Sequence, residues 1–211
     1  MSSIASINSQ ATALGRTKLV AQSPERYSSS GIWVGVFAIT MSFAAFTSAL
    51  FVREGTADWG HLILPPILYL NTLLLLASSG TLELARHWLL CRDRLLRRSA
   101  DDDSTRKASG WVLLTLLLGL AFCVGQYRAW LELRAQGIYL ASNPNSSFFY
   151  LLTFLHALHV CAGVAVLVYL AGRLLASHTT FRMGLFRNAA IYWHFMALLW
   201  LYLFLLCRMK L

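Results

Sequence analysis

Long apolar segments separated by shorter polar ones dominate the pattern of residues along this chain. A bilayer core about 30 Å thick needs about 20 helical residues, and a window of about 19 residues finds five segments that are long enough. They are Gly31 to Val52, Leu62 to Ala85, Gly110 to Trp130, Phe148 to Leu170 and Ala189 to Cys207. Because lipid offers no hydrogen-bond partner to an open backbone, each segment is predicted to be a membrane-spanning helix.

These segments predict an all-α integral membrane protein, a bundle of five transmembrane helices without a separate soluble domain. Composition agrees, since 57% of residues are hydrophobic and only 13% are charged, against about 25% charged in an ordinary soluble domain. Residues 1–30 are polar and lack the basic stretch and short apolar core of a secretory signal. We therefore expect a polar N-terminal tail over 1–30 that stays on the mature protein, followed by a membrane domain over 31–211.

The basic residues are distributed unevenly between the two ends of the predicted helices. Thirteen of the 18 lie in the tail or in segments that alternate onto the same side of the membrane: Arg16, Lys18, Arg26, Arg86, Arg92, Arg94, Arg97, Arg98, Arg106, Lys107, Arg173, Arg182 and Arg187. The opposite side carries Arg53, Arg128, Arg134, Arg208 and Lys210. The positive-inside rule then predicts a cytoplasmic N-terminus and a C-terminus outside. The net charge of +9 is interpreted as this topology signal, with some attraction to anionic lipid heads, and not as a nucleic-acid site.

The centres of the five segments contain no Asp, Glu, Lys or Arg, which argues against a self-contained transporter. A proton or ion path needs a chain of protonatable groups across the membrane. Glu83 and Glu132 are the acidic residues nearest to membrane depth, and they lie near opposite ends. Glu83 precedes Arg86 by three residues, so we interpret it as half of an ion pair at the interface. The charged stretch from Arg92 to Ser109 is expected to be a solvated loop.

Three histidines within the last two apolar segments are the candidates for metal chemistry. His156 and His159 share one helix face, and His194 lies near the start of the following segment. Three imidazoles could bind a metal, or they could be structural polar contacts that link these two helices. No acidic residue lies inside either segment to accept a hydrogen bond from the second ring nitrogen of a metal-binding histidine, which favours the structural interpretation. The four cysteines are scattered without C-x-x-C spacing, so no disulfide framework or metal cluster is predicted.

Several motifs in order along the chain resemble subunit III of cytochrome c oxidase, in the haem–copper oxidase family. The resemblance covers about 31 to 206 and matches the bacterial five-helix form of that subunit. Its residues are Asn71-Thr72 with Ser78-Ser79, Gly125-Gln126, Ser147-Phe148-Phe149-Tyr150-Leu151-Leu152-Thr153 leading into His156 and His159, Gly163, and Tyr192-Trp193-His194-Phe195 with Trp200. The five helices of that form run from the cytoplasm to the outside, as the charge distribution independently predicts.

The resemblance implies a non-catalytic subunit of a terminal respiratory oxidase in the bacterial inner membrane. The complex would reduce O₂ to water with proton translocation, while this chain would carry no haem, copper or other metal. It would pack beside the catalytic subunit I and other oxidase subunits, could join a respiratory supercomplex, and would support the stability and proton uptake of the catalytic subunit. It would also hold bound phospholipid.

The resemblance also implies roles for particular residues. Arg173 matches an arginine of the family that contacts lipid head groups, and Arg187 is a second candidate for lipid phosphate. The structural polar contacts would be His156, His159, His194, Asn71 and Gln126.

The chain departs from the family where membrane carboxylates are usual. Thr40, Ala129 and Ala197 stand at these three positions, so a proton role that depends on those carboxylates does not carry over. Two other interpretations stay open from the sequence. The same fold could serve a quinol oxidase or a nitric oxide reductase as an accessory subunit, or the chain could be a small stand-alone membrane transporter.

Overall fold

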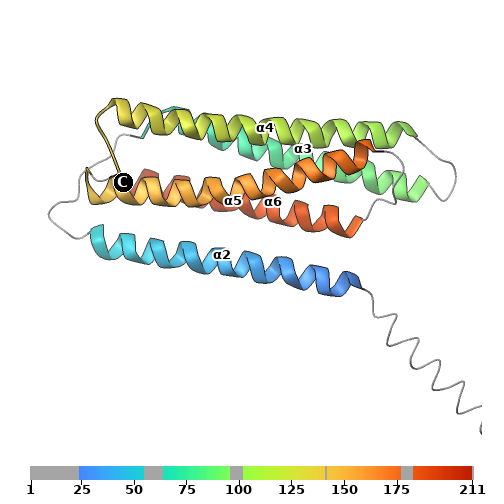
Figure 1. Ribbon diagram of the computed structural model, residues 1–211, viewed down its shortest axis with the longest axis horizontal. Helices are drawn as coiled ribbons and strands as arrows, with labels where there is room; N and C mark the ends of the chain where they lie inside the picture. The colour runs from blue at the N-terminus through green and yellow to red at the C-terminus, as the bar shows by residue number, and fades with distance from the viewer. Residues whose placement is uncertain (1–23, 55–63, 96–101, 141, 177–182, 211) are drawn as a thin grey trace, which may run out of the picture.

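The computed structural model describes residues 24–54, 64–95, 102–140, 142–176 and 183–210, and their side chains except those of 24–29, 92–95 and 102–105. It contains five long helices: α2 (Pro24–Glu54), α3 (Ile67–Leu95), α4 (Asp102–Ala135), α5 (Pro144–Leu175) and α6 (Met183–Lys210). Each is long and apolar enough to cross a membrane. Successive helices run in opposite directions along the bundle (Figure 1). The predicted five-helix membrane fold is confirmed, while the side on which each terminus lies stays a prediction.

Most of the helices extend beyond the apolar segments that predicted them. α2 begins at Pro24, so the helix includes residues 24–30 that were assigned to the tail. The expected loop from Arg92 to Ser109 is shorter, because α3 continues to Leu95 and α4 begins at Asp102. Hydropathy detects only the part of a helix that lies in lipid, whereas Arg, Lys and Leu are also good helix formers in water. Residues 1–23 of the predicted tail over 1–30 lie outside the described residues.

The start of α3 is the exception, because this helix begins later than predicted. The apolar segment starts at Leu62, but the helix begins at Ile67, directly after two prolines. Pro65 and Pro66 each accept a backbone hydrogen bond, from the N–H groups of Leu68 and Tyr69, both at 3.1 Å. A proline pair lacks amide donors but can precede a first turn, whose N–H groups have no partner in any case.

Helices α3, α4, α5 and α6 form a closed group, in which each packs against two of the others. α2 lies on the outside and packs only on α5 and α6, so it does not contact α3, its neighbour in sequence, within the described residues (Figure 1). Two contacts fix its far end to α6. The Tyr202 hydroxyl donates to Thr47 Oγ1 at 3.0 Å, and Lys210 Nζ lies 3.0 Å from Glu54 Oε1.

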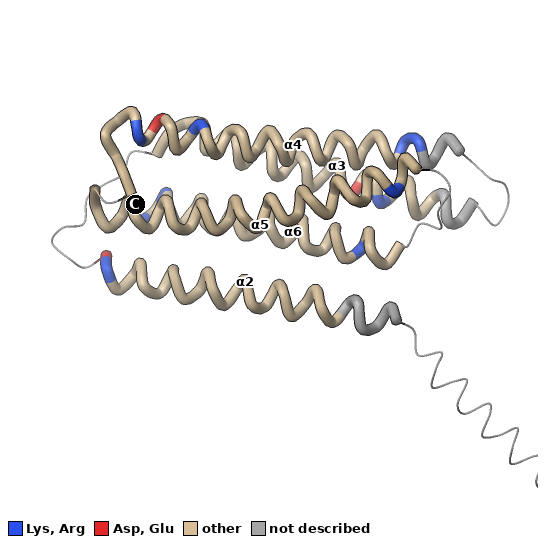
Figure 2. The backbone as a smooth tube through the Cα atoms, in the orientation of Figure 1, with Lys and Arg blue, Asp and Glu red and all other residues tan. Residues whose placement is uncertain are grey.

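The outer face of α2 exposes large apolar side chains. Trp33 is 61% exposed and Val34 is 69% exposed, and Phe37, Met41, Phe51 and Val52 are also exposed. The described Lys, Arg, Asp and Glu residues lie toward the two ends of the helices, with a long uncharged zone between them (Figure 2). This arrangement fits a lipid core flanked by two polar interfaces.

Candidate functional site

Indole N–H groups of α6 donate to hydroxyl groups of α3 at two levels of the bundle. Trp193 Nε1 donates to Ser78 Oγ at 3.0 Å, and Trp200 Nε1 donates to Thr72 Oγ1, also at 3.0 Å. Each hydroxyl in turn donates to a backbone carbonyl of its own helix, Ser78 to Leu75 and Thr72 to Leu68. Both polar atoms of each pair are therefore satisfied where water is absent, and the two helices are held in register.

Trp193 lies at the junction of four helices. It is 1% exposed, and it packs closely against two glycines of the neighbouring helices. A Cβ atom on Gly119 of α4 would lie 2.8 Å from the indole, and one on Gly163 of α5 would lie 3.1 Å from it. Small residues at these positions let the helices approach the ring closely. The position of Trp193 thus depends on α3, α4 and α5 together.

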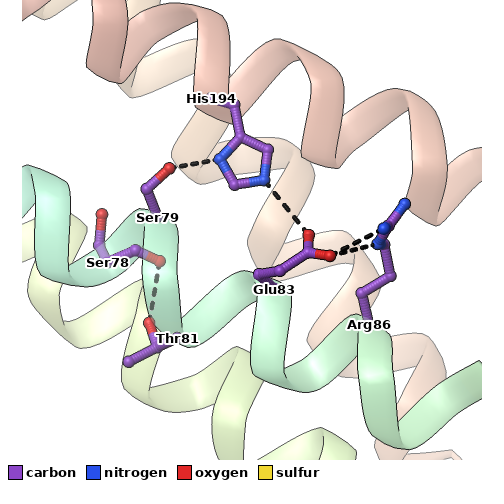
Figure 3. A network of polar contacts seen from close by, with 6 residues as sticks. All are labelled: Ser78, Ser79, Thr81, Glu83, Arg86 and His194. Atoms are coloured by element: carbon purple, nitrogen blue, oxygen red, sulfur yellow. Dashed lines mark hydrogen bonds and ion pairs between the residues drawn. The ribbon is translucent and has the colours of Figure 1, made fainter.

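A polar network joins α3 to α6 near the end of the bundle where α3 terminates (Figure 3). The Ser79 hydroxyl bonds to His194 Nδ1, and His194 Nε2 lies 3.6 Å from Glu83 Oε2. Arg86 donates through Nε to Glu83 Oε1 at 2.8 Å, as the spacing of three residues predicted. If Ser79 donates to Nδ1, the tautomer with a proton on Nε2 presents an N–H to the carboxylate.

This network is better suited to joining helices than to catalysis. Ser79 and His194 do stand in hydroxyl–imidazole–carboxylate order with Glu83, as in some hydrolases. However, Ser79 lies in the middle of α3, where backbone N–H groups bond to carbonyls of the preceding turn and cannot stabilise an oxyanion. Glu83 is half exposed, so its ion pairs are screened and individually weak.

The three candidate metal ligands face different partners and do not converge. His156 is fully buried, and its ring packs against those of Phe122 at 5.9 Å and Trp200 at 5.1 Å, which also contact each other. His159 Nδ1 is 2.6 Å from the carbonyl oxygen of Leu155 on its own helix. Within the described residues, no group of three or more His, Cys, Asp or Glu side chains is arranged to hold a metal ion.

One of the three histidines, His194, connects to a different helix from the one expected. His194 bonds to α3, whereas the sequence interpretation linked it to α5, because the partner of a helix face depends on how the helices are ordered around the bundle. α5 and α6 are joined instead by the Tyr192 hydroxyl, which donates to the backbone carbonyl of His159 at 2.9 Å, and by the contact of His156 with Trp200.

Asn71 and Gln126 form a buried amide pair between α3 and α4. Asn71 Nδ2 donates to Gln126 Oε1 at 3.4 Å, and both side chains are at most 1% exposed. Gly125 makes this contact possible, because a Cβ there would lie 2.0 Å from Asn71 Oδ1. The other two atoms of the pair, Asn71 Oδ1 and Gln126 Nε2, have no hydrogen-bond partner within the described residues.

The two candidate lipid-binding arginines lie at the same end of the bundle as the Ser79–His194 network. Arg173 is in the last turn of α5, half-buried, with its guanidinium 6.0 Å from the centre of the Tyr169 ring. Arg187 is exposed in the second turn of α6. The guanidinium of Arg173 can therefore reach a head group at this end.

The three positions without a carboxylate hold residues that either bond to their own helix or pack inside the bundle. The Thr40 hydroxyl donates to the Val36 carbonyl of its own helix at 2.8 Å. Ala129 and Ala197 are buried, at 0% and 4% exposure.

Sequence reasoning missed the role of Trp193 and its glycine contacts, although the small residues Ser78, Gly119 and Gly163 were a signal for close packing.

Comparison with known proteins identifies relatives of the whole membrane domain. The family model described as cytochrome c oxidase subunit III matches residues 28–209. A probable cytochrome c oxidase subunit 3 of Mycobacterium leprae (strain TN) is 30% identical over 189 residues, which cover 83% of this chain and 84% of that protein. A quinol oxidase subunit 3 of Bacillus spizizenii is 27% identical over 184 residues, 82% of each chain. A cytochrome c oxidase subunit 3 of Lycodon semicarinatus is 28% identical over 155 residues, 71% of this chain and 54% of that protein.

Proposed function

Because this chain belongs to the cytochrome c oxidase subunit III family, we propose that it is the non-catalytic, lipid-holding membrane subunit of a terminal oxidase that reduces O₂ to water and translocates protons. Membership of the family makes the chain a subunit of a haem–copper oxidase complex, with other oxidase subunits as its partners. The observation that carries the proposal is the match over all five helices, from 28 to 209. A stand-alone transporter has no comparable support.

The non-catalytic role is supported by what the histidines do in the bundle. His156 packs against two aromatic rings, His159 bonds to its own helix, and His194 joins α3 to α6. A redox centre would need several of these nitrogens to point at a common position. We propose that haem and copper are held by the partner subunits, and that this chain supports the catalytic subunit I by packing beside it in a bacterial inner membrane.

Co-purification tests the oxidase assignment. When the chain is extracted from its native membrane in mild detergent, a stoichiometric complex with haem signals in the reduced-minus-oxidised spectrum is expected. Dissociating the chain from that complex should leave the haem with the other subunits. A complex without haem would refute the oxidase assignment, and haem that stays with the dissociated chain would refute the non-catalytic role.

The electron donor has two candidates, because a named relative is a quinol oxidase subunit 3 and others are cytochrome c oxidase subunits 3. We favour cytochrome c, because the other relatives named above are cytochrome c oxidase subunits 3. Oxygen uptake by the purified complex with reduced cytochrome c, compared with uptake on a quinol, separates the two.

We propose further that Arg173 holds a phospholipid head group at the end of α5, with Arg187 as a second contact. Replacing Arg173 by alanine is expected to weaken retention of that lipid by about tenfold to a hundredfold, since hydrogen bonds to a charged group contribute about 1.5–3 kcal/mol. Phospholipid per complex is measured by extraction and mass spectrometry after purification. Arg128→Ala is the matched control, because Arg128 is an exposed arginine near the other end of the bundle. Equal lipid content in the wild type and Arg173→Ala would exclude this role.

The proposed support of proton uptake cannot depend on the usual membrane carboxylates of the family. Thr40, Ala129 and Ala197 occupy those positions, and none of these side chains is an acid that ionises near neutral pH. Support of the catalytic subunit is therefore proposed to act through packing and bound lipid.

A further inference from the structure

An apolar pocket opens between α4 and α5 at the end of the bundle opposite to Arg173. Its volume is about 460 Å³, within the range of about 300–1,000 Å³ that is usual for ligand pockets. The lining side chains are Tyr127, Trp130, Arg134, Leu140, Tyr150, Leu151 and Phe154. They come from the last turns of α4, the connection after it and the first half of α5. None of them belongs to the sites described above.

The walls of this pocket are fixed by hydrogen bonds within the chain. Trp130 Nε1 donates to Thr153 Oγ1 of α5 at 3.1 Å, and the Tyr150 hydroxyl donates to the carbonyl of Ile138 at 2.9 Å. The connection turns back at Gly137, whose φ of 78° is a conformation that favours glycine. Because the polar atoms of Trp130 and Tyr150 are bonded to the protein, their rings present apolar surface to the pocket. The pocket is therefore preformed.

The pocket opens toward the lipid, with a positive charge at its end. Tyr127, Leu140 and Phe154 are each more than half exposed, at 58%, 59% and 55%. Arg134 lies in the last turn of α4 and is exposed, and among the described residues no carboxylate lies within ion-pair distance of it. Tyrosine, tryptophan and arginine together are typical of the membrane–water interface. An apolar, chain-sized cavity beside an interfacial guanidinium is complementary to an anionic amphiphile.

We propose that this pocket binds an anionic phospholipid, with one acyl chain between the aromatic walls and the phosphate on the Arg134 guanidinium. A guanidinium can bind a phosphate through two parallel hydrogen bonds. Since α4 and α5 are antiparallel, this lipid lies in the leaflet opposite to the head-group site at Arg173. A transmembrane helix of a neighbouring subunit fits less well, because helix interfaces in membranes favour small residues and these walls are large aromatic side chains.

Native mass spectrometry of the purified complex tests the proposal. The complex is exchanged into phosphatidylcholine nanodiscs doped with phosphatidylglycerol, released, and its retained lipids are identified. Arg134→Gln is expected to bind phosphatidylglycerol at this site about tenfold more weakly, and to weaken phosphatidylcholine less, because its choline cation already compensates the phosphate charge. Leu151→Trp, which fills the pocket, is expected to reduce retention of both lipids. Arg128→Gln is the matched control, since it removes a charge from the same helix outside the pocket, and it should retain lipid as the wild type does.

Three results would overturn the proposal. The first is unchanged phosphatidylglycerol in both Arg134→Gln and Leu151→Trp. The second is an equal loss in Arg128→Gln, because the effect would then follow the net charge. The third is loss of a neighbouring subunit, with lipid unchanged, in Leu151→Trp, which would identify a partner helix as the occupant. If the Leu151→Trp complex fails to assemble, the comparison of Arg134→Gln with Arg128→Gln still tests the proposal. Both arginines are exposed, so both of these variants are expected to fold.

Discussion

Replacing Trp193 by alanine is expected to destabilise the bundle by about 3–5 kcal/mol, the range measured for buried Trp or Phe replaced by Ala. The indole is 1% exposed and fills the space left by Gly119 and Gly163, so its removal leaves a cavity at the junction of four helices. Lipid tails cannot refill a cavity enclosed by protein, and the packing contacts of the ring are lost outright. The hydrogen bond to Ser78 is lost as well.

Unfolding of the isolated chain in mixed detergent micelles, as denaturing detergent is increased, measures this effect. Trp193→Phe keeps most of the ring and removes the N–H donor, so it should cost much less, about 0.6–1.7 kcal/mol for the hydrogen bond in addition to a smaller cavity. Trp33→Ala is the control for loss of an indole, because Trp33 is 61% exposed on α2. If Trp193→Ala were no more destabilising than Trp33→Ala, Trp193 would not be the packing centre of the bundle.

Replacing Gly125 by alanine is expected to destabilise the contact of α3 with α4 by about 1–3 kcal/mol, as overpacking does in other cores. The added methyl group would lie 2.0 Å from Asn71 Oδ1, so either the asparagine rotates away or the helices separate. Rotation breaks the bond to Gln126 and leaves two buried amides without their partner. The same detergent-unfolding measurement, made on the isolated chain, detects this loss.

Two variants make this result specific to the amide contact. Gly110→Ala changes the same helix at a position where a Cβ meets nothing within 4 Å, so it should be neutral or slightly stabilising. Asn71→Ala removes the obstructing atom, and combining it with Gly125→Ala should cost less than the sum of the two single changes. Strictly additive costs would mean that Gly125 and Asn71 do not constrain each other.

The membrane fold could be predicted from the chain because hydropathy is a local property. Each apolar segment needs only its own composition to be driven into lipid as a helix, and all five were found. The helix ends were less predictable. α4 begins at Asp102 although the apolar segment begins at Gly110, because helical hydrogen bonding continues in water where lipid no longer requires it.

The candidate polar residues were identified from the sequence, but not their partners. The Glu83–Arg86 pair was predictable since it joins residues one turn apart. The bond from His194 to Ser79 joins residues 115 positions apart, and no periodicity within either helix indicates it. The motif residues Asn71 and Gln126 were both selected, yet their direct contact, and the need for Gly125 beside it, appear only once α3 and α4 are placed together.

The sequence by itself determined that five helices cross a membrane, that their centres carry no charge, and which family the chain belongs to. Each of these depends only on the type and order of residues along the chain. The tertiary structure decided that α2 packs on α5 and α6 instead of α3, that Trp193 joins four helices, and that an aromatic pocket forms beside Arg134. These features depend on which side chains from distant segments can fill the same space, and close packing settles that for the whole bundle at once.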